Sequence, residues 1–170
     1  MDSTPLRLGV LISGTGSNLQ ALIDAIENKK LANVEIALVV SNKANAYGLQ
    51  RALTHNLPAI YLPWRERTES EERLAALLRL FHVDLLVLAG WMRILSANFI
   101  EQFPRRIINL HPALIPDDGT GDTYTTRDGT EIPVFRGLHV VRQALEAGIK
   151  VTGSTVHYVT PEVDGTGNLP

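Results

Sequence analysis

Two polar side chains that can take part in proton transfer or hydrogen bonding, Asn109 and His111, stand at the end of an apolar run. We predict that the run, residues 106–110, forms a buried strand. Pro112 follows, so we expect the strand to end or twist there, which would let both side chains face a ligand. A histidine at such a place can act as an acid, a base or an oxyanion partner, or it can be structural.

A second polar segment, Ser13 to Asn18, contains Gly14 and Gly16 and lies between a predicted strand and a predicted helix. The N–H groups and the dipole of such a helix N-terminus favour a phosphate monoester. Leu19 replaces the third glycine of a dinucleotide fingerprint, and no Gly-Lys-Ser or Gly-Lys-Thr follows, which argues against an NAD site and a Walker motif. A tight turn capped by Ser17 or Asn18 is an equally good interpretation.

Apolar runs alternate with amphipathic helical segments along the whole chain, which indicates an α/β protein. We expect a Rossmann-like open, mostly parallel sheet with helices on both faces and with the polar segments at the carboxyl ends of its strands. His157 lies in the last strand, where packing or a supporting hydrogen bond is expected. The predicted strands are 6–13, 34–40, 59–62, 83–89, 106–110 and 152–159, and the predicted helices are 18–29, 46–55, 66–81, 96–103 and 138–147.

Composition narrows the class of protein. The 170 residues are 45% hydrophobic and carry a net charge of −2, which fits one domain over residues 1–170 and gives no basic stripe for nucleic acid. The longest apolar runs are too short to cross a membrane, so we expect a cytoplasmic protein. We also expect it to be a monomer or a homodimer. There are no cysteines, which excludes a thiolate nucleophile and cysteine-based metal sites.

The segment 117–134 differs from the rest because it is acidic and rich in turn residues. We expect a loop or hairpin without core character, exposed and more mobile than the sheet, with an active-site lid as the alternative. Its Asp-Gly-Thr repeats lack the ligand spacing of an EF-hand, so a solvated turn is favoured and no metal is expected.

Six motifs lie along the chain: Ser13-Gly14-x-Gly16-Ser17-Asn18-Leu19-Gln20, Ser41-Asn42-Lys43 with Gly48-Leu49, Leu88-Ala89-Gly90-x-Met92-Arg93-Ile94-Leu95, Asn109-x-His111-Pro112, Gly137-Leu138-His139, and Gly153-x-Thr155-Val156-His157 with Val163-Asp164. Taken together, these motifs resemble phosphoribosylglycinamide formyltransferase, a family of purine biosynthesis. The resemblance covers residues 6–116 and 135–164 almost continuously.

The resemblance implies transfer of a formyl group from the co-substrate 10-formyltetrahydrofolate to the amine of 5′-phosphoribosylglycinamide. By this correspondence Asn109 donates to the formyl oxygen, protonated His111 stabilises the oxyanion, and Asp164 keeps His111 charged and aids proton transfer. The substrate phosphate would be held by Gly16, Ser17, Asn18 and Arg67. The folate cleft would be formed by Trp91, Met92, Arg93, Ile94, Leu95, Tyr158 and Val159.

Two departures from the family leave alternatives open. The family has a short connection where this chain has residues 117–134, and it normally continues beyond the position of Pro170. We therefore expect the usual C-terminal part to be absent, as in a reduced relative, a fragment or an engineered chain. A catalytically silent phosphate- or folate-binding module and a 10-formyltetrahydrofolate deformylase are the alternative functions.

Overall fold

The first strand, β1 (Leu6–Ile12), forms the centre of a six-stranded sheet in the computed structural model, which describes residues 4–116, 121–137 and 139–161. It pairs in parallel with β2 (Val34–Ser41) on one side and with β4 (Leu85–Leu88) on the other. Outside these lie β3 (Ala59–Tyr61), β5 (Ile107–His111) and the antiparallel edge strand β8 (Thr155–Tyr158). The strand order is β3-β2-β1-β4-β5-β8.

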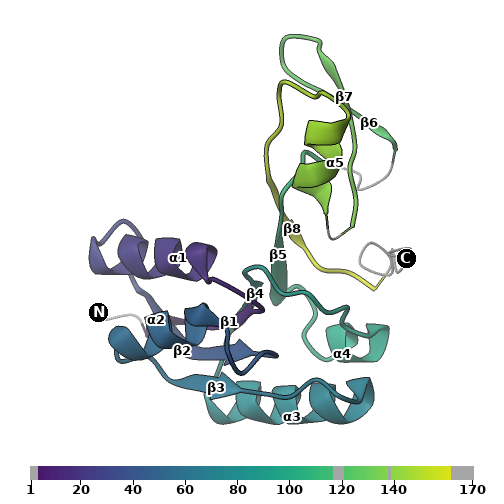
Figure 1. Ribbon diagram of the computed structural model, residues 1–170. Helices are drawn as coiled ribbons and strands as arrows, with labels where there is room; N and C mark the ends of the chain where they lie inside the picture. Colours follow the sequence, from purple (N-terminus) through teal and green to yellow (C-terminus); the bar gives the residue numbers. More distant parts are fainter. Residues whose placement is uncertain (1–3, 117–120, 138, 162–170) are drawn as a thin grey trace.

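Helices cover both faces of this sheet (Figure 1). On one face, α1 (Ser17–Glu27) and α2 (Tyr47–Thr54) pack on Val10 and Ile12 of β1. On the other, α3 (Arg67–Leu80) and α4 (Ala97–Glu101) pack on the cluster that contains Leu11. Successive strand residues point to opposite faces and both faces are covered, so the part of β1 from Val10 to Ile12 is apolar and fully buried. The α/β class and the layered arrangement expected from the sequence are confirmed.

Beyond the body of the sheet, β5 and β8 run toward a smaller part that holds β6 (Thr123–Thr125), β7 (Glu131–Pro133) and α5 (Val140–Glu146) (Figure 1). The antiparallel pair β6–β7 is the hairpin that the sequence allowed for residues 117–134. The expectation that this segment has no core character was wrong for Ile132, whose side chain is only 5% exposed.

The elements are shorter than predicted at several ends. The strand expected at 83–89 is reduced to β4, since the N–H of Val83 closes the turn after α3 by donating to the carbonyl of Leu78. The strand expected at 152–159 and the helix expected at 138–147 are β8 and α5. Ser96 caps α4, because its Oγ accepts a hydrogen bond from the N–H of Phe99 at 3.1 Å.

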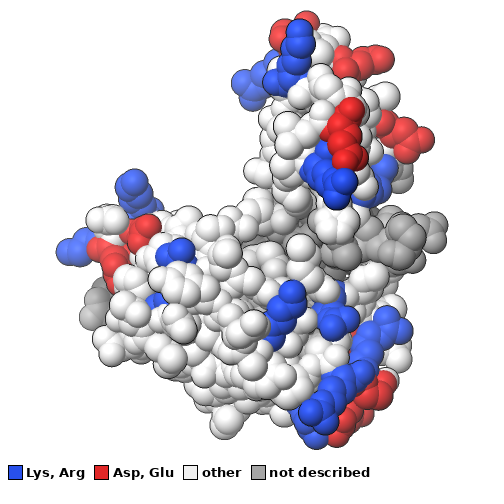
Figure 2. All heavy atoms as spheres, viewed as in Figure 1, with Lys and Arg blue, Asp and Glu red and all other residues white. Residues whose placement is uncertain are grey.

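Charged side chains of both signs are spread over the face shown in Figure 2. Blue and red atoms lie beside one another near the end of α3 and over the smaller upper part, while the middle of the body is mostly uncharged. In the described part of the chain, no helix has the length and apolar character needed to cross a membrane.

Candidate active site at the carboxyl edge of the sheet

The chain changes direction between β1 and β4, and the polar segments gather at the carboxyl ends of these strands. From β1 the chain builds outward through β2 and β3, and from β4 it builds the other way through β5. Two hydrogen bonds join the loops that follow β1 and β4: the N–H of Met92 donates to Ser13 Oγ at 2.8 Å, and the N–H of Ser13 donates to the Gly90 carbonyl at 3.1 Å. Open α/β sheets bind ligands at such a switch point.

Asn109 and His111 both lie inside β5, which ends at His111, directly before Pro112, as expected. A strand that continues through both positions places their side chains on the same face, because the side-chain repeat is two residues. Across the antiparallel pair, Asn109 stands opposite His157 and His111 stands opposite Thr155. Both candidate residues are half-buried rather than enclosed in the core.

The ring of His157 holds the amide of Asn109, which confirms the supporting hydrogen bond expected for this histidine. His157 Nδ1 lies 3.1 Å from the carbonyl oxygen of Tyr158, which can only accept, so Nδ1 carries the proton. In the neutral ring Nε2 then accepts from Asn109 Nδ2, 3.4 Å away. This arrangement fixes the amide orientation and leaves the second N–H of Asn109 for a ligand.

His111 is held by the chain segment after the β6–β7 hairpin, which sequence reasoning did not connect with it. Its Nε2 lies 2.8 Å from the Phe135 carbonyl oxygen and therefore donates, which leaves Nδ1 as the free ring atom. Burial lowers the pKa of His111, as do the charges of His157 and Arg136 to a smaller extent, while the bond to Phe135 acts in the opposite direction. The described surroundings favour the neutral His111 ring, whereas the protonated ring was expected. Asp164, which was expected to favour the charged ring, lies outside the described residues.

The glycine-containing loop begins α1 without a side-chain cap. Gly16 is the N-cap residue, with φ of 70°, and no side chain caps the helix, so the interpretation of Ser17 or Asn18 as cap was wrong. Both belong to the first turn of α1. Among the described residues, the N–H groups of Thr15, Gly16 and Ser17 find no backbone acceptor. These donors and the helix dipole can bind an anion.

Gly48 lies against this loop and was not singled out as functional from the sequence. A Cβ on Gly16 would come within 2.6 Å of Gly48 Cα, and a Cβ on Gly48 would come within 2.3 Å of Ile12 Cδ1. The N–H of Gly48 donates to the Gly14 carbonyl at 3.1 Å. The motif around Ser41-Asn42-Lys43 included Gly48, but only the fold shows that it makes room for the loop.

The remaining candidates differ in exposure. Arg67 is exposed at the first position of α3, next to Glu66, whose side chain caps that helix. Met92, Arg93 and Tyr158 are exposed and Ile94 is partly buried. Trp91, Leu95 and Val159 are buried in the core beside α3 and α4, where Trp91 meets Trp64 edge to face at 5.0 Å. The first group can contact a ligand by side chain, whereas the second can shape the floor beneath it.

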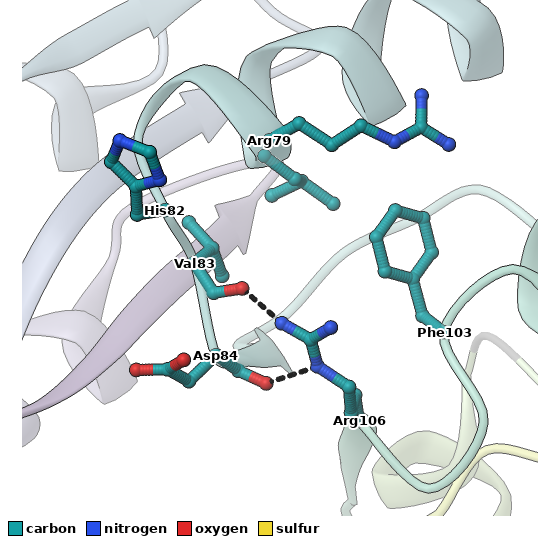
Figure 3. Close-up of a pocket in the computed structure, with 7 residues that line it drawn as sticks. Arg79, His82, Val83, Asp84, Phe103 and Arg106 are labelled. Atoms are coloured by element: carbon teal, nitrogen blue, oxygen red, sulfur yellow. Dashed lines mark hydrogen bonds between the residues drawn. The ribbon is translucent and has the colours of Figure 1, made fainter.

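A separate hollow of about 300 Å³ lies at the opposite, amino end of β4 (Figure 3). Its wall includes Arg106, whose guanidinium binds the backbone carbonyls of Val83 and Asp84. The positions of Val83 and Asp84 directly before β4 place this hollow away from the carboxyl-end site. Within the described residues, no three His, Asp or Glu side chains are close enough together to hold a metal ion.

One known protein family matches most of this chain. The family described as "Formyl transferase" matches residues 6–123 and 130–169, which include every candidate site residue. The chain belongs to the formyl transferase family. The match leaves out residues 124–129, the tip of the β6–β7 hairpin and its flanks.

Relatives of known function are about two fifths identical to this chain over the residues that align. The phosphoribosylglycinamide formyltransferase of Escherichia coli is 41% identical over 165 residues, which cover 94% of this chain and 68% of the relative. The trifunctional purine biosynthetic protein adenosine-3 of Drosophila melanogaster is also 41% identical, over 93% of this chain. The chain spans only 11% of that longer protein.

Solved structures agree with the fold. Glycinamide ribonucleotide transformylase 1 from Symbiobacterium toebii superposes with a TM-score of 0.78 at 39% identity, over 94% of this chain and 68% of that one. The phosphoribosylglycinamide formyltransferase of Coxiella burnetii gives a TM-score of 0.74 at 40% identity, over 92% of this chain and 66% of that one.

Proposed function

We propose that this formyl transferase family member transfers the formyl group of 10-formyltetrahydrofolate to the amine of 5′-phosphoribosylglycinamide. The observation that carries the proposal is the position of Asn109 and His111 on one face of β5, at the same sheet edge as the Gly16 loop. One end of this edge offers donors for a phosphate, and the other offers an amide and an imidazole for a reacting carbonyl.

The spacing of the sheet suits a substrate that reaches from one end to the other. Leu11, Leu88 and Asn109 lie in one row across β1, β4 and β5. Two strand spacings of about 4.8 Å separate β1 from β5, so the carboxyl end of β1, which leads into the loop, lies roughly 10 Å from β5. A phosphate bound at the loop would leave the other end of a ribonucleotide next to β5.

The chemistry needs a donor for negative charge on oxygen and a route for one proton. The substrate amine attacks the formyl carbon, the new C–N bond forms, and the C–N10 bond of the folate breaks. The amine loses a proton and N10 gains one. The free N–H of Asn109 and, when the ring is protonated, His111 Nδ1 would donate to the oxyanion, an interaction whose loss typically costs about 3 kcal/mol of barrier.

Asp164 and the folate-binding residues complete the proposal. A carboxylate near His111 would oppose the effect of burial on its pKa and keep the ring charged during the reaction. Gly16, Ser17, Asn18 and Arg67 would hold the phosphate. The segments 91–95 and 158–159 would bind the pterin, with the exposed side chains of Met92 and Tyr158 in contact and with Trp91 and Val159 beneath.

An assay of the purified chain with 10-formyltetrahydrofolate, with and without 5′-phosphoribosylglycinamide, tests the proposal. We expect formyl transfer only when the nucleotide is present. Loss of the formyl group without nucleotide would instead indicate a deformylase, and binding without turnover would indicate a silent binding module. Asn109→Ala should abolish most of the turnover, whereas Asn98→Ala, at an exposed position of α4, is the matched control and should not change it.

A further inference from the structure

The backbone of the Gly16 loop is fastened to α2 by two successive carbonyl groups. The Gly14 carbonyl accepts from the N–H of Gly48 at 3.1 Å, and the Thr15 carbonyl accepts from Arg51 Nε at 2.9 Å. Gly16 and Gly48 are in close backbone contact beside these bonds. The first two turns of α2 thus support the loop that precedes α1.

These two bonds decide where the neighbouring N–H groups point. In a trans peptide the C=O and N–H of one plane point in opposite directions, and the described chain has no cis peptide. Fixing the carbonyls of Gly14 and Thr15 against α2 therefore directs the N–H groups of Thr15 and Gly16 away from α2. These are N–H groups that lack a backbone acceptor among the described residues.

The Arg51 side chain is itself held in one orientation. Its Nη1 donates to Gln20 Oε1 of α1 at 3.0 Å, and its guanidinium carbon lies 4.9 Å from the centre of the Tyr47 ring. The Arg51 guanidinium thus binds Thr15 and Gln20 at its edges and the Tyr47 ring at one face. The contacts with Gln20 and Tyr47 already restrict the side chain, so it loses less conformational entropy when it binds the loop. A lysine could supply the charge, but not the fork that reaches both Thr15 and Gln20.

We propose that Arg51 is a positioning residue for phosphate binding, which orients the Thr15 and Gly16 N–H groups toward a phosphate monoester by holding the Thr15 carbonyl. The inference rests on the phosphate-binding role given to the loop in the proposed function. It assigns to α2 a part in substrate specificity, since the helix would favour phosphorylated over unphosphorylated substrates.

The test is the binding of ribose 5-phosphate, followed by the amide resonances of Thr15 and Gly16, in the wild-type chain and in Arg51→Met. We expect the affinity for ribose 5-phosphate to fall about tenfold or more in the variant, since a hydrogen bond to a charged group is lost. Folate affinity should stay near wild type, and the fall in Tm from the lost Arg51 contacts should be small. Arg51→Lys should recover only part of the affinity, and Arg73→Met, on the exposed surface of α3, is the matched control.

Each other outcome has a clear meaning. Equal binding in wild type and Arg51→Met would overturn the proposal, and so would a wild-type chain whose loop resonances do not respond to ribose 5-phosphate. An equal loss of folate affinity or a large fall in Tm in both Arg51 variants would show a general structural role instead. The formyl transfer assay tests the proposed reaction separately. If Arg51→Met selectively lowers the affinity for ribose 5-phosphate but the wild-type chain transfers no formyl group, the role of Arg51 would be supported and the proposed reaction refuted.

Discussion

Replacing Gly16 by alanine tests whether the loop before α1 depends on a backbone that only glycine allows. At φ of 70° the residue is left-handed, which costs an alanine roughly 1–2 kcal/mol. The new Cβ would also lie 2.6 Å from Gly48 Cα, and because that atom is backbone it cannot turn aside. Overpacking of this kind adds about 1–3 kcal/mol. The expected loss of stability is therefore about 2–5 kcal/mol.

Two other glycines separate the two contributions. Gly90 has φ of 83°, but a Cβ there meets no described atom within 4 Å, so Gly90→Ala should lose only the conformational part. Gly14 is not left-handed and is equally open, so Gly14→Ala should behave like wild type. For a chain of this size each kcal/mol lowers Tm by about 2–4 °C, which gives a fall of about 4–20 °C for Gly16→Ala.

Thermal unfolding and isothermal titration of the three variants measure these effects. If α1 keeps its place and the loop shifts, the nucleotide should lose at least about tenfold in affinity, while folate affinity should change little. Gly16→Ala that melts like Gly14→Ala would refute the contact with Gly48. An equal loss of both ligands would mean that the substitution disturbs the whole sheet and not the loop alone.

Further substitutions address the reaction and the smaller part of the fold. His111→Ala and Asp164→Asn should each lower kcat at least about a hundredfold with little change in nucleotide affinity, since both residues act on charge formed in the transition state. A variant with unchanged kcat would show that the residue it replaces has no part in the mechanism. Burial lowers the pKa of His111 below 6.5, so as the pH falls the unfolded chain binds this proton before the folded chain does. The free energy of unfolding of the wild type should therefore decrease as the pH drops below 6.5. Urea titrations should show a smaller decrease for His111→Gln over the same pH range. His157→Leu should lower kcat about tenfold by freeing the Asn109 amide, measured against unchanged nucleotide affinity. Ile132→Ala should destabilise the chain by about 2 kcal/mol or more, whereas Val141→Ala, at a half-exposed position, should lose much less in the same melt.

The sequence by itself determined the class of fold and the edge of the sheet that carries the candidate site. Apolar periodicity is a local property, so the alternation of buried strands and amphipathic helices was visible without tertiary information. Asn109 and His111, two residues apart, share a face by the geometry of any strand. The resemblance to formyltransferases added roles for these residues, although Asp164 lies outside the described part of the chain.

The tertiary structure decided which partners these residues have. Arg51 reaches Thr15 across 36 positions of sequence and Asn109 reaches His157 across 48, and no local pattern encodes contacts at such separations. The pKa of His111 depends on burial and on Phe135, which come together only when the hairpin and β5 are in place. Ile132 is an apolar residue in a polar, turn-rich segment, so the composition of its neighbours gave no sign of its burial, which only the folded structure shows.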